Sequence, residues 1–324
     1  MWRQYDHQLF LNTVEAPGGD AAVLRLKHPT SGVDTGRALA LTTDGNHRWC
    51  AVDPRLGAAA TVAEAVLNLA VVGARPVALV DNLNFGNPEH AEVMWQLSEA
   101  VDGIGDACRA LRIPVIGGNV SLYNESRGRD IDPTPVVGVL GVVDDLRRRP
   151  PGVRLVEDHR LVVLGPPSDP SLAGSRLAAD HGFARLGELP ACDLDIVAST
   201  AAVTRDLVAA GAVSGAHDVA EGGVLAALAE MAVASGVGFQ VARLHSLADL
   251  FGESAGRVVL CVGADALSGV VATAEAAGVG VARIGLAGGD RMIVKDVLDL
   301  ALADAVAAWR DRLPAALGHG TTQG

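Results

Sequence analysis

The chain has 324 residues, of which 49% are hydrophobic and 20% are charged, so it can fill two hydrophobic cores and is not intrinsically disordered. The formal net charge of -12 at pH 7 argues against nonspecific binding to nucleic acid or to an anionic membrane surface. Lys27 and Lys295 are the only lysines and no G-x-x-x-x-G-K-[ST] motif occurs, which excludes a P-loop nucleotide site.

The four cysteines are scattered, without a C-x-x-C pair or zinc-finger spacing, and are expected to be small buried hydrophobes. Residues 1–6 are polar and lack the apolar core of a signal peptide. Polar residues or glycine interrupt every apolar stretch before about 18 residues, so no transmembrane helix is expected. These features predict a soluble cytoplasmic protein.

The first part of the chain alternates apolar runs typical of strands with helical patterns. Strands are predicted at residues 38–43, 76–80, 114–116 and 135–143, and helices at 58–72 and 91–111. The segment Arg147-Arg148-Arg149-Pro150-Pro151-Gly152 cannot continue a helix or a central strand, so the domain boundary is placed there. A solvated linker is the favoured interpretation of its arginines, and an anion site is the alternative.

The second part is predicted to form strands at 160–164, 237–241, 258–262 and 281–284, with helices at 171–181, 193–210 and 223–235. The residues after 313 are expected to be frayed. The chain is therefore expected to be α/β or α+β, with one domain over residues 1–149 and another over 150–324.

Two polar, glycine-bearing segments form the main candidate site: 81–88 (D-N-L-N-F-G-N-P) and 117–124 (G-G-N-V-S-L-Y-N). Each follows an apolar run typical of a buried strand, and a helix-length segment separates them. The pattern therefore predicts two loops that open at the same edge of one sheet, where α/β proteins bind ligands. Asparagine and glycine there suit phosphate and hydrated Mg²⁺.

Asp81 could orient a nucleotide hydroxyl or amine or join a Mg²⁺ shell, or it could belong to an Asp-Asn turn that caps the following helix. Gly117 and Gly118 would let the backbone pass close to a ligand. Asn119 offers a neutral oxygen to a hard cation, and Ser121 offers a hydroxyl to a phosphate or substrate. A tight Gly-Gly-Asn turn is the alternative for this segment.

A third segment, Asp44-Gly45-Asn46-His47, could be a further ligand loop. A β-hairpin with residues 49–52 as the return strand is favoured, because Asp-Gly and Gly-Asn are strong turn signals.

Two segments of the second part carry chemically capable side chains. In 216–223 (A-H-D-V-A-E-G-G), His217, Asp218 and Glu221 could bind a metal, but a packed strand–turn–helix junction is favoured. In 251–257 (F-G-E-S-A-G-R), Ser254 and Arg257 could bind an anion, and a surface loop with a salt bridge explains the segment equally well.

Taken in order, the segments D-N-L-N-F-G-N-P, M-W-Q, G-N-V-S-L-Y-N, P-T-P-V-V-G, A-H-D-V-x-E-G-G and F-G-E-S-x-G-R resemble the C-terminal half of phosphoribosylformylglycinamidine synthases, over about residues 5–295. The opening Tyr5-Asp6-His7-Gln8 resembles the segment that enters this half. The resemblance implies a fold of the aminoimidazole-ribonucleotide-synthetase superfamily: a barrel-forming A-type domain over 1–149, then a B-type α/β domain over 150–324.

The resemblance also implies part of an ATP-dependent ligase of purine biosynthesis. In that family ATP phosphorylates the amide oxygen of formylglycinamide ribonucleotide, and glutamine-derived ammonia displaces phosphate to give the amidine. The implied cofactors are ATP and Mg²⁺. The implied partners are the N-terminal half of the same enzyme, a glutaminase subunit and a small accessory subunit.

Carried over residue by residue, Asp81 and Gly118 are expected to contact ATP, Asn119 to bind Mg²⁺, and Ser121 to contact the ribonucleotide. The family's catalytic histidine, ATP-binding lysine and acidic Mg²⁺ ligands surround an E-S-H-N-H-P-type motif that is absent here. The symmetry-related segment contains His47, which is not assigned as a catalyst.

The chain is therefore expected to be inactive alone, either as a fragment of a longer enzyme or as a half-length protein that needs a partner. The alternative is a non-catalytic structural half that holds ADP. An A-type domain alone would leave one sheet face open, so self-association as a two-fold homodimer is expected.

Overall fold

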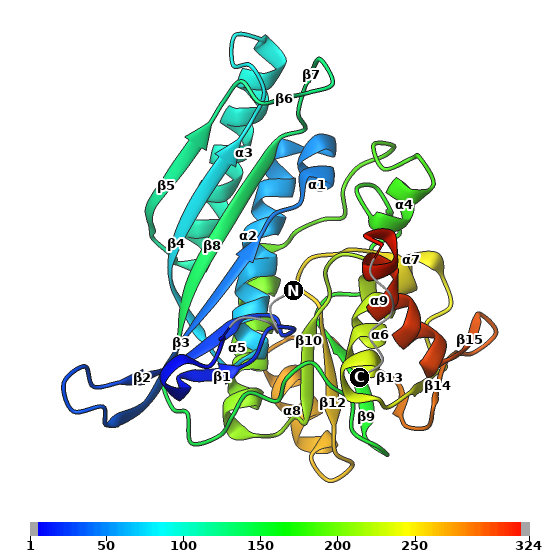
Figure 1. Cartoon of the computed structure of the whole chain (residues 1–324). Coiled ribbons are helices and arrows are strands. Elements are labelled where there is room, and N and C mark those ends of the chain that lie inside the picture. Colours follow the sequence, from blue (N-terminus) through cyan, green and yellow to red (C-terminus); the bar gives the residue numbers. More distant parts are fainter. Residues whose placement is uncertain (1–5, 319–324) are drawn as a thin grey trace.

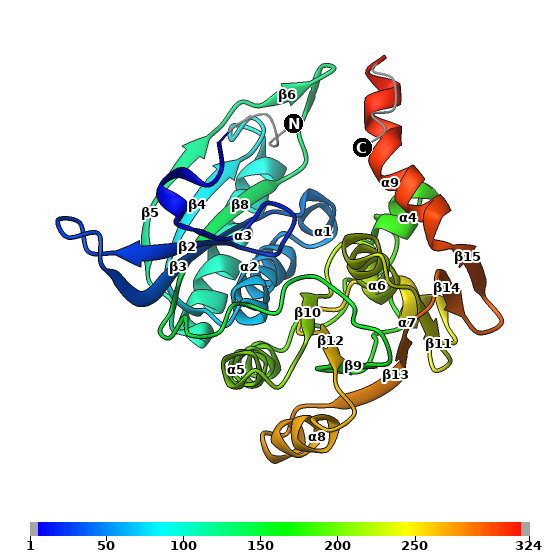
Figure 2. The ribbon, with the colours of Figure 1, turned by 60° about the horizontal axis from the view of Figure 1, so that its bottom comes forward.

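The computed structural model describes residues 6–318 as two α/β halves, each built on one large sheet (Figures 1 and 2). The expected mixed α/β class is confirmed. The first sheet has the strand order β1-β2-β3-β8-β4-β5, and the second has the order β10-β12-β9-β13-β11-β14-β15.

The elements of the first half are the 3-10 helix η2 (Leu9–Leu11), β1 (Thr13–Glu15), β2 (Ala22–Lys27), β3 (Asp34–Asp44), α1 (His47–Val52), α2 (Pro54–Val71), β4 (Arg75–Asn84), α3 (Ala91–Leu111), β5 (Val115–Ser121), the small hairpin β6 (Glu125–Ser126) and β7 (Arg129–Asp130), and β8 (Thr134–Val143).

Those of the second half are β9 (Arg160–Leu164), α4 (Arg176–Asp180), α5 (Leu194–Ala210), β10 (Gly215–Asp218), α6 (Gly223–Ser235), β11 (Phe239–Val241), α7 (Leu247–Phe251), β12 (Val258–Val262), α8 (Leu267–Ala276), β13 (Val281–Ala287), β14 (Arg291–Val294), β15 (Leu298–Ala301) and α9 (Leu302–Ala316).

Helix α2 is the centre of the molecule. It is rich in alanine and apolar on all sides, which is typical of a helix that is buried all round. It packs on the first sheet, on α3 and on α5 of the second half. At the α2–α3 crossing a Cβ on Gly103 would lie 2.1 Å from the carbonyl oxygen of Arg55, so only glycine fits there. One hydrophobic core therefore continues from the first sheet through α2 and α5 to the second sheet.

The first sheet has one covered and one open face. Figure 1 shows α2 and α3 behind the same face. The α-helices of the described chain leave the other face uncovered, and Leu24, Leu41 and Val80 are 39%, 43% and 43% exposed on it. These side chains share this face because their strands pair in register.

The connection between the halves, residues 144–159, contains neither helix nor strand, and the predicted boundary at 149–150 falls within it. Arg147 agrees with the favoured interpretation of a solvated linker, since it pairs with Asp145 at the surface. Arg148 instead donates to the carbonyl oxygen of Ala210 at the end of α5.

Several predicted elements have the observed bounds, including α3, α6 and β12. The helix predicted over 171–181 is mostly wrong: only Arg176–Asp180 is helical, because Ser175 caps it by accepting from the backbone N–H of Ala178. The predicted fraying begins too early, since α9 continues to Ala316; residues 319–324 lie outside the described residues. Within residues 6–318, no helix combines the length and apolarity needed to cross a bilayer.

Candidate functional site

The two polar segments of the sequence lie side by side on neighbouring parallel strands, joined by the crossover helix α3 (Figure 1). They meet at the same edge of one sheet, as predicted. The prediction that both are loops is wrong for residues 81–84 and 117–121, which continue β4 and β5. Pairing with β5 on one side and β8 on the other gives the polar residues of β4 a regular ladder.

Asp81 and Gly118 are register partners and lie on the helix-covered side of the sheet. A Cβ on Gly118 would lie 2.4 Å from Asp81 Oδ1, so the carboxylate occupies the space that a side chain at 118 would need. Burial raises the pKa of Asp81. Burial and then the Asp81 charge raise the pKa of Cys108 on α3, which places the carboxylate close to that helix. Asp81 is not the turn or cap residue of the alternative interpretation.

Asn119 and Ser121 lie on the opposite, open face, because side chains alternate along a strand. Asn119 pairs in register with Asn82, and its Nδ2 donates to Asn82 Oδ1 at 3.1 Å. Within residues 6–318 the Oδ1 of Asn119 accepts no hydrogen bond, so it is available to a ligand. The structure thus brings together Asp81 with Gly118 and Asn119 with Asn82, but it separates the two pairs across the sheet.

The chain beyond Ser121 turns back on the β4–α3 connection. Asn124 Nδ2 donates to the carbonyl oxygens of Phe85 at 3.0 Å and Ser121 at 2.9 Å. The Asp130 carboxylate accepts from the Asn87 backbone N–H at 2.7 Å and lies 2.7 Å from His90 Nδ1. These contacts fix the two segments against each other.

The predicted hairpin at residues 44–52 is wrong. Asn46 is instead the N-cap of α1, and its Oδ1 accepts from the backbone N–H groups of Arg48 and Trp49 at 3.1 and 3.3 Å. The capping preference of asparagine therefore prevails over the turn preference of Asp-Gly. His47 becomes the first residue of a helix that faces the second half.

Glu253, from the F-G-E-S-A-G-R segment, joins the two halves. It is 5% exposed and accepts three hydrogen bonds, from Trp49 Nε1 at 3.0 Å, the Arg176 backbone N–H at 2.6 Å and the Gly222 backbone N–H at 2.8 Å. The surface-loop interpretation of this segment is wrong, because Ser254 and Arg257 are also buried.

A group of carboxylates lies where the halves meet, and we call Asp20, Asp44, Glu64 and Asp218 the acidic cluster. They line one cavity of about 590 Å³ beside the end of β3. Its described lining includes no arginine or lysine. Asp44 accepts from Thr42 Oγ1 at 2.8 Å and from Asn68 Nδ2 at 2.7 Å. Burial raises the pKa of Asp44 to about 7 and that of Glu64 well above its usual range.

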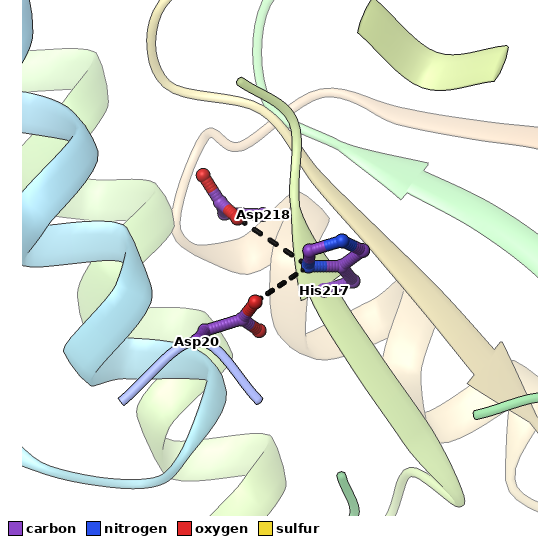
Figure 3. Close-up of side chains that lie close together, drawn as sticks. All are labelled: Asp20, His217 and Asp218. Carbon is purple, nitrogen blue, oxygen red and sulfur yellow. Dashed lines mark ion pairs between the residues drawn. The ribbon is translucent and has the colours of Figure 1, made fainter. Parts of the chain in front are cut away.

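His217 lies beside this cluster (Figure 3). Its Nδ1 is 2.7 Å from Asp20 Oδ1 and 3.4 Å from Asp218 Oδ1, and its Nε2 is 2.8 Å from Glu230 Oε2. Burial alone would lower the pKa of His217, but the Asp20 carboxylate, helped by Asp218 and Glu230, raises it well above its usual range. Burial raises the pKa of Asp20 to about 6 despite the opposing effect of His217.

The geometry allows a cation at this place. Ligand atoms of Asp20, His217 and Asp218 lie within 4.8 Å of one another. Glu221, which the sequence grouped with them, lies apart and pairs with Arg48 at 3.2 Å and Arg176 at 3.5 Å. The favoured strand–turn–helix junction is confirmed, since β10 ends at Asp218 and α6 begins at Gly223.

Sequence reasoning missed Asp20, Glu64 and Asn68. A usable signal existed for two of them, because Glu64 and Asn68 are polar residues four apart in the mainly apolar helix α2. Asp20 lies in an irregular segment and gave no such signal.

The chain is thus a mixed α/β protein with one sheet in each half and an acidic cavity where the two halves meet. Residues 18–143 match the family model "AIR synthase related protein, N-terminal domain", and residues 156–296 match its C-terminal domain. The chain belongs to this AIR synthase related family.

Among its relatives are phosphoribosylformylglycinamidine synthase subunits PurL. The subunit of Moorella thermoacetica is 44% identical over 322 residues, which cover 97% of this chain and 43% of the relative. That of Thermomicrobium roseum is 42% identical over 318 residues, covering 95% of this chain and 42% of the relative. The chain thus spans less than half the length of these relatives. The resemblance to phosphoribosylformylglycinamidine synthases is confirmed.

A solved structure described as Thermotoga maritima PurL complexed with FGAR shares the fold. It aligns with a TM-score of 0.72 and 19% identity, covering 92% of this chain and 49% of that one. The expected A-type and B-type organisation is confirmed at the level of the fold. In the described chain the first sheet is open, with β1 and β5 at its edges.

Proposed function

We propose that this chain is the C-terminal half of an ATP-dependent ligase that converts formylglycinamide ribonucleotide and glutamine-derived ammonia to the amidine. The observation that supports this most is the registered pair β4–β5, which places Asp81 against Gly118 and leaves the Asn119 amide oxygen free beside Asn82. Relatives that carry the PurL name and are 42–44% identical support the same reaction.

Each side chain receives a role that its environment suits. Asp81 and Gly118 would contact ATP: glycine at 118 leaves room for the Asp81 carboxylate, which would accept hydrogen bonds from the nucleotide. Structures of T. maritima PurL complexed with ADP and with ATP support nucleotide binding.

On the open face, Asn119 would hold Mg²⁺ through Oδ1, and Ser121 would contact the ribonucleotide. The neutral amide oxygen is a suitable ligand for a hard cation. When bound, Mg²⁺ would neutralise charge on the phosphate oxygens. The chain's own residues would hold and orient the two substrates across the end of the sheet.

The remaining groups would come from partners. We expect activity to require the N-terminal half. Two observations support this: the chain spans 43% of the M. thermoacetica relative, and its sequence contains no E-S-H-N-H-P-type motif. The open face of the first sheet is the surface that this half would cover. The structure described as PurLQS from T. maritima supports further partners, which we propose to be the glutaminase and small accessory subunits. Without the N-terminal half, two copies of this chain would pair through the same face.

A second candidate function is a structural half that holds ADP. The acidic cluster favours it, because carboxylates in a cavity whose described lining has no arginine or lysine suit the Mg²⁺ ions of a bound diphosphate. In this case the nucleotide would stay bound between the two halves of the chain and would not react.

Two measurements separate the candidates. Mass spectrometry of the denatured, freshly purified chain should find no stoichiometric ADP if the chain only supplies part of a catalytic site, whereas retained ADP supports the structural role. Titration of ATP with Mg²⁺ into a complex with the N-terminal half should give binding that Asn119→Ala weakens. Binding that Asp44→Asn weakens and Asn119→Ala leaves unchanged would contradict the catalytic assignment.

A further inference from the structure

A second cavity, of about 670 Å³, lies in the second half of the chain. Its walls come from the turn after β9, from the connection after β11, from α7, α8 and β13, and from the residue that precedes β12. The residues used below are Ser168, Arg243, Asp249, Arg257, Glu275 and Arg283. None of its lining residues belongs to β4 or β5, so it is separate from the proposed ATP site.

Arg257 is the unusual member of this wall. It is 3% exposed, yet its Nε and Nη1 are buried without a hydrogen-bond partner among residues 6–318. A buried cation without a partner is costly, so such a group is normally paired or bound to a ligand. Burial lowers the pKa of Arg257 to about 10, which still leaves the guanidinium charged at neutral pH.

Asp249 is the carboxylate whose charge acts on Arg257, but it does not pair with the guanidinium. Asp249 raises the pKa of Arg257 through its charge, but the two do not form an ion pair within 4 Å in the described chain. Asp249 accepts from the backbone N–H groups of Ser246 and His245 at 3.1 and 3.3 Å and also from the Ser168 hydroxyl. Oδ2 of Asp249 is therefore committed to the cap of α7, and the Ser168 hydroxyl also uses this carboxylate.

Two further arginines at the rim of the cavity add to the positive charge of the Arg257 guanidinium. Arg243 and Arg283 line the cavity and are exposed, whereas Asp249 and Glu275 are the acidic residues of the lining. Three arginines against two carboxylates favour an anion over a cation or an apolar ligand. A guanidinium fork suits the oxygens of a phosphate group, and the volume leaves room for an attached small organic group.

We propose that this cavity binds a phosphate group, either as inorganic phosphate or as the phosphate of a small ester, with Arg257 as the fixed donor and Arg243 and Arg283 at the rim. This develops the anion interpretation of the F-G-E-S-A-G-R segment with Arg257 as its centre. Ser254 is not part of the site, because its Oγ accepts from the Asp169 backbone N–H at 3.1 Å and does not line the cavity.

The test uses the full chain in EDTA, titrated with sodium phosphate at constant ionic strength against sodium chloride. Thermal midpoint and calorimetric binding are measured for the wild type, for Arg257→Met and for the control Arg109→Met, a surface arginine on α3 with a 73% exposed side chain. Saturable binding should weaken about tenfold or more in Arg257→Met, the scale for losing a charged hydrogen bond, and be unchanged in the control. Without phosphate, Arg257→Met should be as stable as the wild type or more stable.

Equal phosphate binding by wild type and Arg257→Met, or no saturable binding by the wild type, would overturn the proposal. So would a large loss of stability in Arg257→Met without phosphate, because it would show that the guanidinium already has partners. The double variant Arg243→Gln with Arg283→Gln tests the site without changing Arg257: binding about two- to fivefold weaker supports the site, and unchanged binding overturns it. Competition by ribose 5-phosphate distinguishes an ester from inorganic phosphate alone.

Discussion

The free energy of unfolding should depend on pH because of the acidic cluster, and a substitution at Asp44 tests the direction of this dependence. Because burial raises its pKa from 3.8 to about 7, the folded protein prefers the protonated carboxyl. Stability from this group is fully present below about pH 4 and is lost as pH rises through about 7. The shift corresponds to about 4 kcal/mol, and sharing with the neighbouring carboxylates reduces the expected effect to about 2–4 kcal/mol.

The perturbation is Asp44→Asn, which removes the charge and keeps the shape. Asn68 Nδ2 can still donate to the new Oδ1, and the new amide can donate to Thr42 Oγ1. Urea unfolding in EDTA at pH 4.5, 6, 7 and 8 should show the variant about 2–4 kcal/mol more stable than the wild type at pH 8, with little difference at pH 4.5.

The matched control is Asp145→Asn at the surface, where hydrogen bonds from Arg147 lower the pKa of the carboxyl to about 2. This control should not change the slope between pH 4.5 and 8. Parallel pH profiles for the wild type and Asp44→Asn would refute the reasoning. Adding Mg²⁺ at pH 8 should stabilise the wild type more than the variant if the acidic cluster binds a cation.

Three further substitutions test the candidate site and the junction between the halves. Asn119→Ala should lower ATP use by the reconstituted enzyme about 10- to 100-fold, with partial rescue by excess Mg²⁺; an unchanged Mg²⁺ profile would mean that it is only structural. Gly118→Ala should displace Asp81 and lower kcat/KM for ATP about 10- to 100-fold, and unchanged kinetics would contradict the proposed contact. Glu253→Gln places an amide against Trp49 Nε1 and should cost about 1–3 kcal/mol in urea unfolding; a cost below about 0.5 kcal/mol would contradict its role.

Much of the fold follows from local pattern. Helices α3 and α6 and strand β12 have the bounds that apolar periodicity predicts, because each buries one apolar stripe or run. The loop prediction failed at 81–84 and 117–121 because strand formation there depends on pairing between segments far apart in the chain. Composition alone favours turns for Asn and Gly, and the ladder with β8 overrides it.

The sequence predicted that the two polar segments lie at the same edge of one sheet. It did not predict which face of the sheet each side chain lies on. A loop has no alternation, whereas a strand sends Asp81 and Asn119 to opposite faces. The acidic cluster was out of reach for a different reason. Asp20, Asp44, Glu64 and Asp218 come from four separate segments, and the packing of α2 between the halves brings them together.

The most direct test of the central claim is amidine formation from formylglycinamide ribonucleotide, ATP, Mg²⁺ and ammonia, followed by mass spectrometry. The assay compares this chain alone, the N-terminal half of the M. thermoacetica relative alone, and the two combined. The proposed function predicts background rates for each part and turnover for the mixture, which Asn119→Ala should reduce. Full turnover by this chain alone, or no turnover by a mixture that forms a stable complex, would contradict it.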